Sequence, residues 1–244
     1  MKVQYEEEVN SFFETHHCPT KIIKGYGMTE ICAAVCTTAL PECNRSGSVG
    51  IPFTHSVVSI FHPETGKELS YNESGEVCMQ GPHVMLGYYK NEQETSHVLR
   101  KHPDGSVWLH SGDMGYMDED GCLFIQGRIK SMIIRGDGFK VFPNLVEQTV
   151  MMCEDVYACA VIGADDPSFS QGQRPFVFVV RRDGYTGTDE VLKERLQKLC
   201  REELPEYALP MDYRFINVLP LTGIGKVDYL SLEKELESPS RNPA

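Results

Sequence analysis

Residues 111–140 read SGDMGYMDEDGCLFIQGRIKSMIIRGDGFK. Within this stretch, Gly115 to Met117 and Cys122 to Ile125 flank the acidic segment 118–121, which is the pattern of a β-hairpin with glycine at its turn. A Gly-Arg pair, a lysine and a glycine-rich loop follow. Before the stretch, the chain alternates short β-rich runs with turns; after it, apolar strands alternate with amphipathic helices. This change of pattern predicts a junction between two folding units.

Upstream of the junction, the apolar runs Val57 to Phe61 and Glu76 to Gln80 predict strands separated by turn residues. This alternation of short strands and turns favours a small antiparallel β meander or barrel. A helix is expected from Asn91 to Arg100, with Asn91 as its N-cap and Glu94 as the capping-box partner.

The opening segment VQYEEEVNSFF predicts an amphipathic helix. Its apolar residues Tyr5, Val9, Phe12 and Phe13 fall on one helical face, which leaves the glutamate run 6–8 on the other face. We therefore expect the glutamates to face solvent.

Downstream of the junction, helices and strands alternate as in a compact α+β domain. The expected elements are a helix from Leu145 to Cys153, strands at 158–162, 175–181 and 213–218, a helix capped by Thr188, and a last helix from Tyr229 to Leu236. The predicted fold class is thus α+β, with a β meander or barrel followed by an α+β domain.

The composition narrows the range of functions. A formal net charge of −12, from 35 acidic and 23 basic residues, argues against nucleic acid or an anionic membrane as a partner. No apolar run is long enough to span a bilayer. The nine cysteines are odd in number and irregularly spaced, which favours reduced thiols and a cytoplasmic protein. Cys32, Cys36 and Cys43 are better explained as small core residues than as zinc ligands.

Several residue patterns could bind a nucleotide. The turn GYGMTE at 25–30 could hold phosphate and Mg²⁺ through backbone donors, a hydroxyl and a carboxylate. Asp113 could accept hydrogen bonds from ribose hydroxyls, and Arg128 could donate to ribose or phosphate oxygens. Lys226 could neutralise charge on a phosphate in a transition state. Taken singly, each also fits an ordinary turn or a solvated surface residue.

The order of these motifs resembles the adenylate-forming (AMP-binding) superfamily, of the acyl-CoA synthetase, coumarate-CoA ligase and luciferase type. The matching segments are GYGMTE at 25–30, GPHVMLGYYKNEQET at 81–95, SGDMGYMDEDG at 111–121, GRIKSMIIRGDGFKVFP at 127–143 and PLTGIGKVD at 220–228. They run nearly from one end of the chain to the other. The family resemblance is therefore a better explanation of the motifs than a set of ordinary turns and solvated surface residues.

The resemblance implies roles for the first motif. Tyr26 lies against the adenine in such enzymes, and Gly27 belongs to the same nucleotide-binding turn. Thr29 contacts the α-phosphate, and Glu30 holds Mg²⁺; both are expected to take part in catalysis.

The resemblance also implies roles for the later motifs. Asp113 would bind the ribose hydroxyls with help from Arg128, and Lys130 would be the hinge about which a small C-terminal domain turns. Lys226 would be the catalytic lysine that reaches the acyl carboxylate and the α-phosphate. The loop 135–139, with Gly136 and Gly138, would face the active site in the thiol-accepting conformation.

The implied enzyme is an ATP-dependent, AMP-forming acid–thiol ligase. A carboxylate attacks the α-phosphorus of ATP to give an acyl adenylate and pyrophosphate, and coenzyme A then displaces AMP after a domain rotation. The expected cofactors and co-substrates are ATP or AMP, Mg²⁺ and coenzyme A, and fatty acid metabolism is the expected setting. Residues 1–127 would be the C-terminal part of the large AMP-binding domain, and residues 128–244 the small mobile domain.

Three departures from the family pattern qualify this expectation. Ser111 stands where threonine is usual, Tyr229 where arginine is common, and the loop 135–139 is one residue longer than usual. The phosphate-binding segment expected far upstream of Tyr26 is missing, so we expect a C-terminal portion of a longer enzyme that is inactive without its N-terminal domain. The alternatives are an adenylation domain of a peptide synthetase and a non-catalytic nucleotide-binding or regulatory module.

Overall fold

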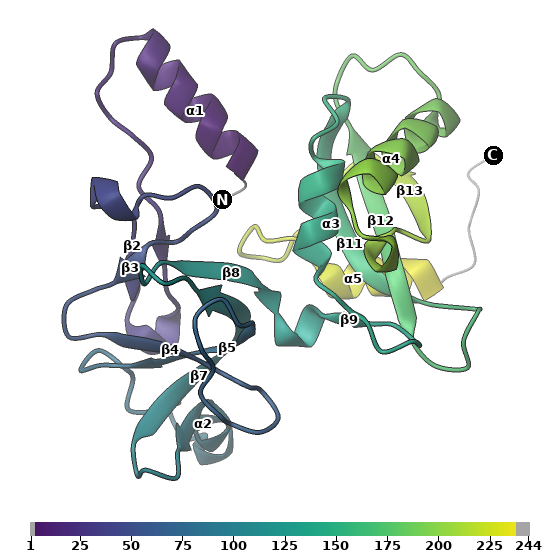
Figure 1. The fold of residues 1–244 in the computed structure, drawn as a ribbon. Helices are drawn as coiled ribbons and strands as arrows, with labels where there is room; N and C mark the ends of the chain where they lie inside the picture. The colour runs from purple at the N-terminus through teal and green to yellow at the C-terminus, as the bar shows by residue number, and fades with distance from the viewer. Residues whose placement is uncertain (1–2, 238–244) are drawn as a thin grey trace. The chain divides into compact units, whose positions relative to one another are not determined.

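The computed structural model describes residues 3–237 of the chain, which form two compact units divided between Lys130 and Ser131 (Figure 1). The α+β class is confirmed, because antiparallel sheets make up most of the first unit and helices cover a mixed sheet in the second. The placing of the parent enzyme's domain boundary at 127/128 stays a prediction. Within residues 3–237, no helix combines the length and apolarity needed to cross a bilayer.

The first unit is built around the long strand β7. Its helices and strands are α1 (Val3–Thr15), β1 (Gly25–Tyr26), β2 (Cys36–Thr37), β3 (Ile51–Pro52), β4 (Val57–Phe61), β5 (Gly75–Gln80), α2 (Glu92–Val98), β6 (Leu99–Lys101), β7 (Val107–Met117) and β8 (Leu123–Arg128). The larger sheet has the order β4-β5-β7-β6, with β8 also paired to β7, and a second sheet has the order β1-β2-β3. The turn Asp118 to Gly121 joins β7 to β8, as the hairpin pattern predicts.

One face of the larger sheet forms the core of this unit. Val77, Met79 and Leu109 are fully buried there, together with Ile31 from the segment after β1. The opposite face carries a separate small cluster that includes Phe61 and Trp108. Because strand side chains alternate between faces, these two clusters use alternate residues of the same strands.

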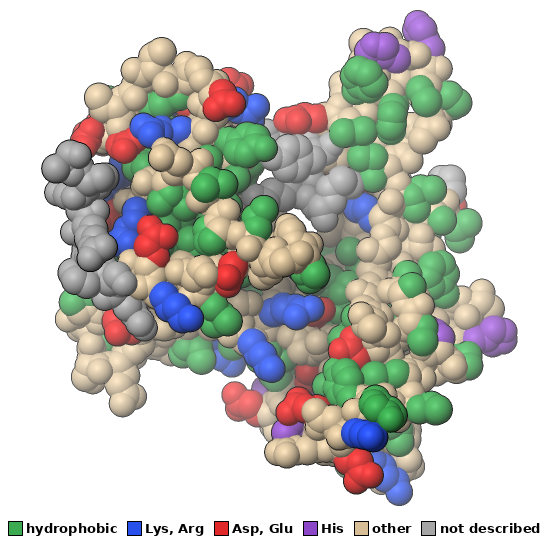
Figure 2. Space-filling model, turned by 180° about the vertical axis from the view of Figure 1, so that it is seen from behind, with side chains coloured by type: hydrophobic (Ala, Val, Ile, Leu, Met, Phe, Trp, Pro, Cys, Tyr) green, Lys and Arg blue, Asp and Glu red, His purple; other side chains and the backbone are tan. Residues whose placement is uncertain are grey.

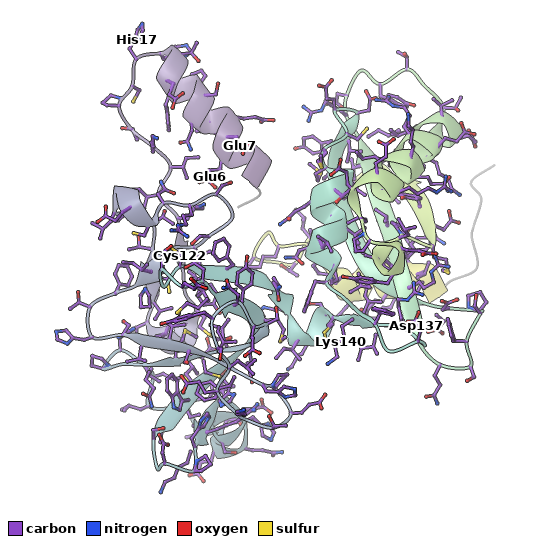
Figure 3. The ribbon with its side chains drawn as sticks, in the orientation of Figure 1. Glu6, Glu7, His17, Cys122, Asp137 and Lys140 are labelled. Carbon is purple, nitrogen blue, oxygen red and sulfur yellow. The ribbon has the colours of Figure 1, made fainter. Side chains whose placement is uncertain are left out.

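The expected solvent face of α1 is wrong at one position. Glu6 is buried and forms an ion pair with Lys24 at 2.7 Å, whereas Glu7 and Glu8 are exposed. Figure 3 labels Glu6 and Glu7 on α1. Phe12, expected on the packing face, is 58% exposed. The cause is the cation of Lys24, which draws one carboxylate of the run inward; the side chain of Tyr5 lies outside the described residues.

The helix expected from Asn91 to Arg100 is shorter than predicted. Asn91 does cap α2, because its side chain accepts a hydrogen bond from the Glu94 backbone at 3.1 Å. The helix ends at Val98, however, and residues 99–101 pair with β7 as strand β6. Cross-strand hydrogen bonds at the sheet edge outweigh local helix propensity there.

The second unit has a three-stranded sheet covered on both faces. Its helices and strands are η3 (Ile129–Ser131, which starts in the first unit), β9 (Ile133–Ile134), β10 (Lys140–Val141), α3 (Pro143–Val150), β11 (Val156–Asp165), β12 (Gln173–Arg181), α4 (Asp189–Glu203), β13 (Asp212–Ile216) and α5 (Tyr229–Glu237). The remaining short 3-10 turns are η1 (Thr29–Ile31), η2 (Pro41–Cys43) and η4 (Glu206–Ala208). In the sheet β11-β12-β13, the first pair is antiparallel and the second is parallel.

The helices of the second unit bury the two faces of this sheet. Figure 1 shows α3 and α4 on one face, where Val146 and Leu192 pack against residues such as Val177. On the other face, Leu232 of α5 packs with Phe178. Each face therefore has its own apolar core within a single small unit.

Charged side chains of both signs are interspersed over the surface seen in Figure 2. On that face the acidic side chains do not form one continuous negative patch, despite their excess in the sequence. This distribution fits a local binding site better than a broad charged binding surface.

Candidate functional site

The structure brings three of the predicted site residues together in the first unit. Tyr26 on β1 donates a hydrogen bond from its Oη to Asp113 Oδ2 at 2.6 Å. Asp113 on β7 lies directly opposite Arg128 on β8 in the strand register, and Arg128 Nε lies 3.2 Å from Asp113 Oδ1. A phenol and a guanidinium from strands far apart in sequence thus hold the two oxygens of one carboxylate.

Asp113 is only 7% exposed, and its backbone is also fixed. Ser111 Oγ accepts a hydrogen bond from the Asp113 backbone at 3.0 Å and donates to the Val77 carbonyl at 2.6 Å. Burial and the adjoining Asp113 carboxylate raise the pKa of Tyr26, so its phenol remains a donor at neutral pH. Sequence reasoning noted Ser111 only as a family substitution and missed this positioning contact.

Gly27 allows a close backbone approach that no other residue permits. A Cβ added at this position would lie 1.8 Å from the Ala33 carbonyl oxygen. The turn after it is also constrained, because Cys32 and Ala33 have positive φ values of 55° and 124°. Such strained backbone often occurs at ligand-binding turns.

Thr29 and Glu30 lie on the short 3-10 turn η1 between Gly27 and these strained residues. Tyr88 donates a hydrogen bond from its Oη to Glu30 Oε1 at 2.5 Å, and the Met85 backbone donates to the Glu30 carbonyl at 2.8 Å. The hydrogen bond to Glu30, with some burial, raises the pKa of Tyr88 to about 12. Tyr88 is a positioning contact that sequence reasoning missed, although it lies in the quoted segment 81–95.

Lys130 is exposed and lies in η3, where the first unit ends. The turn is a short 3-10 segment between β8 and β9, the kind of element that often serves as a connector or hinge. The described geometry fits a pivot, but the hinge role remains a prediction.

The loop between β9 and β10 carries Gly136 and Gly138, with Asp137 between them (Figure 3). Arg135 donates to both oxygens of the Asp137 carboxylate, at 3.0 Å and 3.2 Å from Nε and 2.6 Å from Nη2, and also to the Tyr207 carbonyl at 3.1 Å. The Arg135 guanidinium lowers the pKa of Asp137. The loop is therefore internally braced.

Glycine is favoured at these two loop positions for different physical reasons. A Cβ at Gly136 would clash with Phe169 and with the Gln171 carbonyl, whereas Gly138 has a φ of 87°. Phe139 stacks on Tyr207 with ring centroids 4.9 Å apart. These contacts within the protein fix the shape of the loop.

Lys226 is exposed at the end of a tight loop in the second unit. Thr222 and Lys226 are joined by a backbone hydrogen bond of 2.7 Å, and Gly225 adopts a φ of 79°. The loop thus presents the lysine on a fixed backbone. Nearby in the sequence, Tyr229 donates to Glu147 Oε1 at 3.1 Å, which gives the residue in the usual arginine position a structural partner.

Family models match both parts of the chain. Residues 4–89 match the model described as AMP-binding enzyme, and residues 145–226 match the model described as AMP-binding enzyme C-terminal domain. Together the two matches cover more than half of the chain.

Curated relatives agree with these matches. A long-chain-fatty-acid–CoA ligase of Bacillus subtilis (strain 168) is 35% identical over 207 residues, which cover 85% of this chain and 35% of that protein. A long-chain-fatty-acid–CoA ligase of Salmonella typhimurium is 34% identical over 220 residues, which cover 90% of this chain and 36% of that protein. The chain spans about a third of the length of these relatives.

Solved structures show the same fold. ATP-bound MatB from Rhodopseudomonas palustris is similar with a TM-score of 0.78 and 28% identity, over 90% of this chain and 41% of that one. The o-succinylbenzoate CoA synthetase MenE from Bacillus subtilis, in complex with the acyl-adenylate OSB-AMP, is similar with a TM-score of 0.79 and 26% identity, over 100% and 45% of the two chains. With motifs, fold and both family matches in agreement, this chain belongs to the adenylate-forming, AMP-binding enzyme family.

Proposed function

We propose that this chain is the C-terminal part of an ATP-dependent, AMP-forming acyl-CoA ligase and that it carries residues that bind the nucleotide. The enzyme would join a carboxylic acid to AMP with release of pyrophosphate and then transfer the acyl group to the thiol of coenzyme A. The ligase names of the curated relatives support this reaction class.

The observation that carries the proposal is the grip formed by Tyr26, Asp113 and Arg128. The Asp113 carboxylate is held on both oxygens by these two neighbours, at 2.6 Å and 3.2 Å. A preorganised carboxylate of this kind suits the two hydroxyls of a ribose, because a carboxylate offers several acceptor positions in one plane. Arg128, whose side chain is 68% exposed, would contribute donors to ribose or phosphate oxygens.

Thr29 and Glu30 fit the phosphate end of the same nucleotide. Glu30 offers a carboxylate oriented by Tyr88, and oxygen ligands of this kind are what Mg²⁺ prefers. A bound Mg²⁺ would neutralise phosphate charge. The Thr29 hydroxyl, on the exposed side of η1, would donate to the α-phosphate.

Lys226 would act in the adenylation step by bringing a cation to the carboxylate and α-phosphate. Two anions must meet in that step, so a fixed positive charge stabilises the transition state more than the ground state. Lys130 would be the pivot of the domain rotation, after which the loop with Gly136 and Gly138 would serve the coenzyme A step.

A fatty acid is the carboxylate that the relatives' names favour. A panel of fatty, aryl and amino acids tests this choice. The assay is carboxylate-dependent exchange of pyrophosphate into ATP, followed by detection of the coenzyme A thioester.

The grip can be tested on this chain directly by titrating AMP and following binding by NMR. Asp113→Asn should weaken AMP binding by about tenfold or more, because it removes charge-assisted hydrogen bonds. The matched control is Glu119→Gln, which replaces an exposed carboxylate in the β7–β8 turn by an amide and should leave AMP binding unchanged. Equal affinity of the two variants would contradict the grip.

The turnover assay separates the alternatives. We expect no appreciable pyrophosphate exchange from the 244-residue chain alone, and adenylation plus thioester formation from a longer protein that contains it. Adenylate transfer to a carrier protein in place of coenzyme A would favour a peptide synthetase. AMP binding without exchange in any such protein would favour a regulatory module.

A further inference from the structure

A cluster of three potential metal ligands lies on the face of the larger sheet opposite the main core. Glu76 and Cys78 are two residues apart on β5, so their side chains point to the same face. His110 on β7 lies directly opposite Cys78 in the strand register. The residues between and beside them, Val77 and Leu109, point into the core on the other face.

The side chains of this cluster converge on one point. Glu76 Oε2 lies 2.8 Å from His110 Nδ1, and Cys78 Sγ lies 3.4 Å from the same nitrogen. One ligand atom from each of the three residues falls within 4.8 Å of the others. All three residues are buried, with exposures of 3%, 0% and 6% for Glu76, Cys78 and His110.

This geometry differs from that of a catalytic relay. In a Cys-His-carboxylate triad, the thiol and the carboxylate contact opposite nitrogens of the imidazole. Here both contact Nδ1, and one proton on that nitrogen cannot satisfy the two at once. A single cation between the three groups can contact all of them, because each would direct a lone pair towards it.

The other nitrogen of His110 has a partner that suits a metal-bound imidazole. His110 Nε2 lies 3.0 Å from His102 Nε2, so the two rings share one proton along that line. Metal-binding histidines nearly always donate their second ring N–H to an acceptor. Phe61 and Trp108 cover the cluster, with the Phe61 ring 4.6 Å from His102 and 5.0 Å from Trp108.

We propose that Glu76, Cys78 and His110 form a three-ligand Zn²⁺ site that stabilises the sheet next to Asp113, with the fourth coordination position taken by a solvent molecule. Thiolate, imidazole and carboxylate are the zinc ligand types, and neighbouring ligand atoms of a tetrahedral zinc ion lie roughly 3–4 Å apart, close to the spacings observed here. The site would be electrically neutral, because one thiolate and one carboxylate balance the ion. The proposal stands independently of the proposed ligase activity.

Metal binding at this site has a defined proton balance. The Cys78 thiol must lose its proton to solvent. His110 must also lose the Nδ1 proton that faces Glu76 Oε2 and carry its one remaining proton on Nε2, from which it donates to His102 Nε2. The cation takes the place of the thiol proton on the sulfur, so metal binding at Cys78 releases one proton to solvent.

The site connects to the residues that bind the nucleotide in our proposal. Glu76 Oε1 accepts a hydrogen bond from the Gly112 backbone at 3.1 Å, while Oε2 points to His110. Gly112 directly precedes Asp113. A cation that fixes the Glu76 carboxylate would thus also fix the backbone that carries Asp113.

A competing explanation is a metal-free buried ion pair. Glu76 Oε2 also lies 3.8 Å from Arg100, and the carboxylate could be neutralised by His110 and Arg100 alone. That explanation gives Cys78 no role beyond packing and requires no metal affinity. The two explanations therefore differ in what a metal titration shows.

The test is a Co²⁺ titration of the reduced, metal-free 244-residue chain, followed by absorption spectroscopy. We expect one Co²⁺ per chain, a thiolate-to-cobalt charge-transfer band and the visible bands of a tetrahedral ion, all removed by one equivalent of Zn²⁺. Cys78→Ser should abolish the charge-transfer band. Cys43→Ser replaces a buried cysteine outside the cluster and should retain it.

A second set of variants covers the case in which Cys78→Ser does not fold. Glu76→Gln keeps the thiol but removes a ligand and should weaken Co²⁺ binding by at least about tenfold, whereas His102→Ala should weaken it about 10- to 100-fold by removing the outer partner. Zn²⁺ should also raise the melting temperature of the unmodified chain. No charge-transfer band in the unmodified chain, a band that survives in folded Cys78→Ser, or unchanged affinity in Glu76→Gln would overturn the site.

Discussion

Gly27 shows how a single residue type determines the shape of the turn that we propose binds the nucleotide. The Ala33 carbonyl oxygen occupies the space where a Cβ would lie, and the strained residues Cys32 and Ala33 follow directly. Since the obstacle is backbone and not a flexible side chain, the turn cannot relax around a larger residue. The position therefore couples the shape of η1 to the packing beneath it.

Gly27→Ala should destabilise the first unit by about 1–3 kcal/mol, the usual cost of inserting a methyl group into occupied space. Urea unfolding followed by circular dichroism measures the difference. Gly223→Ala is the control, because nothing lies within 4 Å of a Cβ at that position, and it should change stability by less than about 0.5 kcal/mol. A neutral Gly27→Ala would mean that the turn is more adaptable than the structure indicates.

The Tyr88 hydroxyl and the Glu30 carboxylate form a coupled pair at the same site. Donation to Glu30 raises the pKa of Tyr88 to about 12, above its ordinary value near 10. The contribution of this hydrogen bond to stability is therefore present below about pH 10 and lost as the pH rises towards 12. At neutral pH the phenol keeps one carboxylate oxygen oriented.

An ultraviolet absorption titration of the tyrosines checks this pair. Tyr88→Phe should remove one phenol that ionises late. Glu30→Gln should leave all tyrosines in place but shift that late ionisation to lower pH, because the negative acceptor is gone. If the titration curve of Glu30→Gln matches that of the unmodified chain, the pair does not form in solution.

At the scale of elements, helix α1 is tied to the first unit through an ion pair. Glu6 in its first turn meets Lys24 at 2.7 Å, and both side chains are about 8% exposed. Lys24 also donates to the Arg45 carbonyl at 3.1 Å. Two polar contacts, this ion pair and a hydrogen bond of 2.9 Å from the Ile22 backbone to Asn10 Oδ1, thus link α1 to the segment before β1.

Glu6→Ala should destabilise the protein by about 2 kcal/mol, because the buried charge of Lys24 then keeps only the Arg45 carbonyl as a partner among the described residues. Glu7→Ala alters an exposed neighbour and should have little effect. Thermal unfolding of the two variants side by side provides the measurement. Equal melting temperatures would show that the ion pair contributes no net stability.

The strands and helices differ in how far local sequence defines them. Asn91 and Thr188 cap α2 and α4 through contacts with residues three positions ahead, so those helix starts follow from the sequence. The end of α2 does not, because residues 99–101 gain partners from β7 that only the folded sheet supplies. Local capping is visible in a sequence, whereas competition from a distant strand is not.

At the scale of the whole molecule, the second unit has the features of an independent folding domain. Its sheet is buried on both faces by its own helices, with Leu192 and Leu196 in one core and Phe178 and Leu232 in the other. A mobile C-terminal domain, as we propose, must keep its structure while it turns.

Residues 131–244, produced alone, should therefore melt cooperatively. Leu192→Ala in this fragment should cost about 2–5 kcal/mol, because Leu192 is fully buried. Leu230→Ala replaces a residue that is 68% exposed on α5 and is the matched control. A fragment without a cooperative transition would show that the second unit depends on the first.

The sequence by itself determined the fold class, the hairpin at 111–128, the helix caps and the order of motifs that marks the family. These features rest on local spacing and residue type, which are present in the chain before it folds. It also predicted Tyr26, Asp113 and Arg128 as members of one site, although Tyr26 and Asp113 are 87 positions apart, because each belongs to a recognisable motif.

Only the tertiary structure decided which carboxylate of the run at 6–8 is buried, where α2 gives way to a strand, and which side chains meet across the sheet. Glu76, Cys78 and His110 lie in no common motif, and 34 residues separate Glu76 from His110. Strand alternation places Glu76 and Cys78 on one face, but the register between β5 and β7, with its irregularity after Glu76, brings His110 to them. That register depends on the packing of the whole sheet, so the cluster exists only in the folded protein.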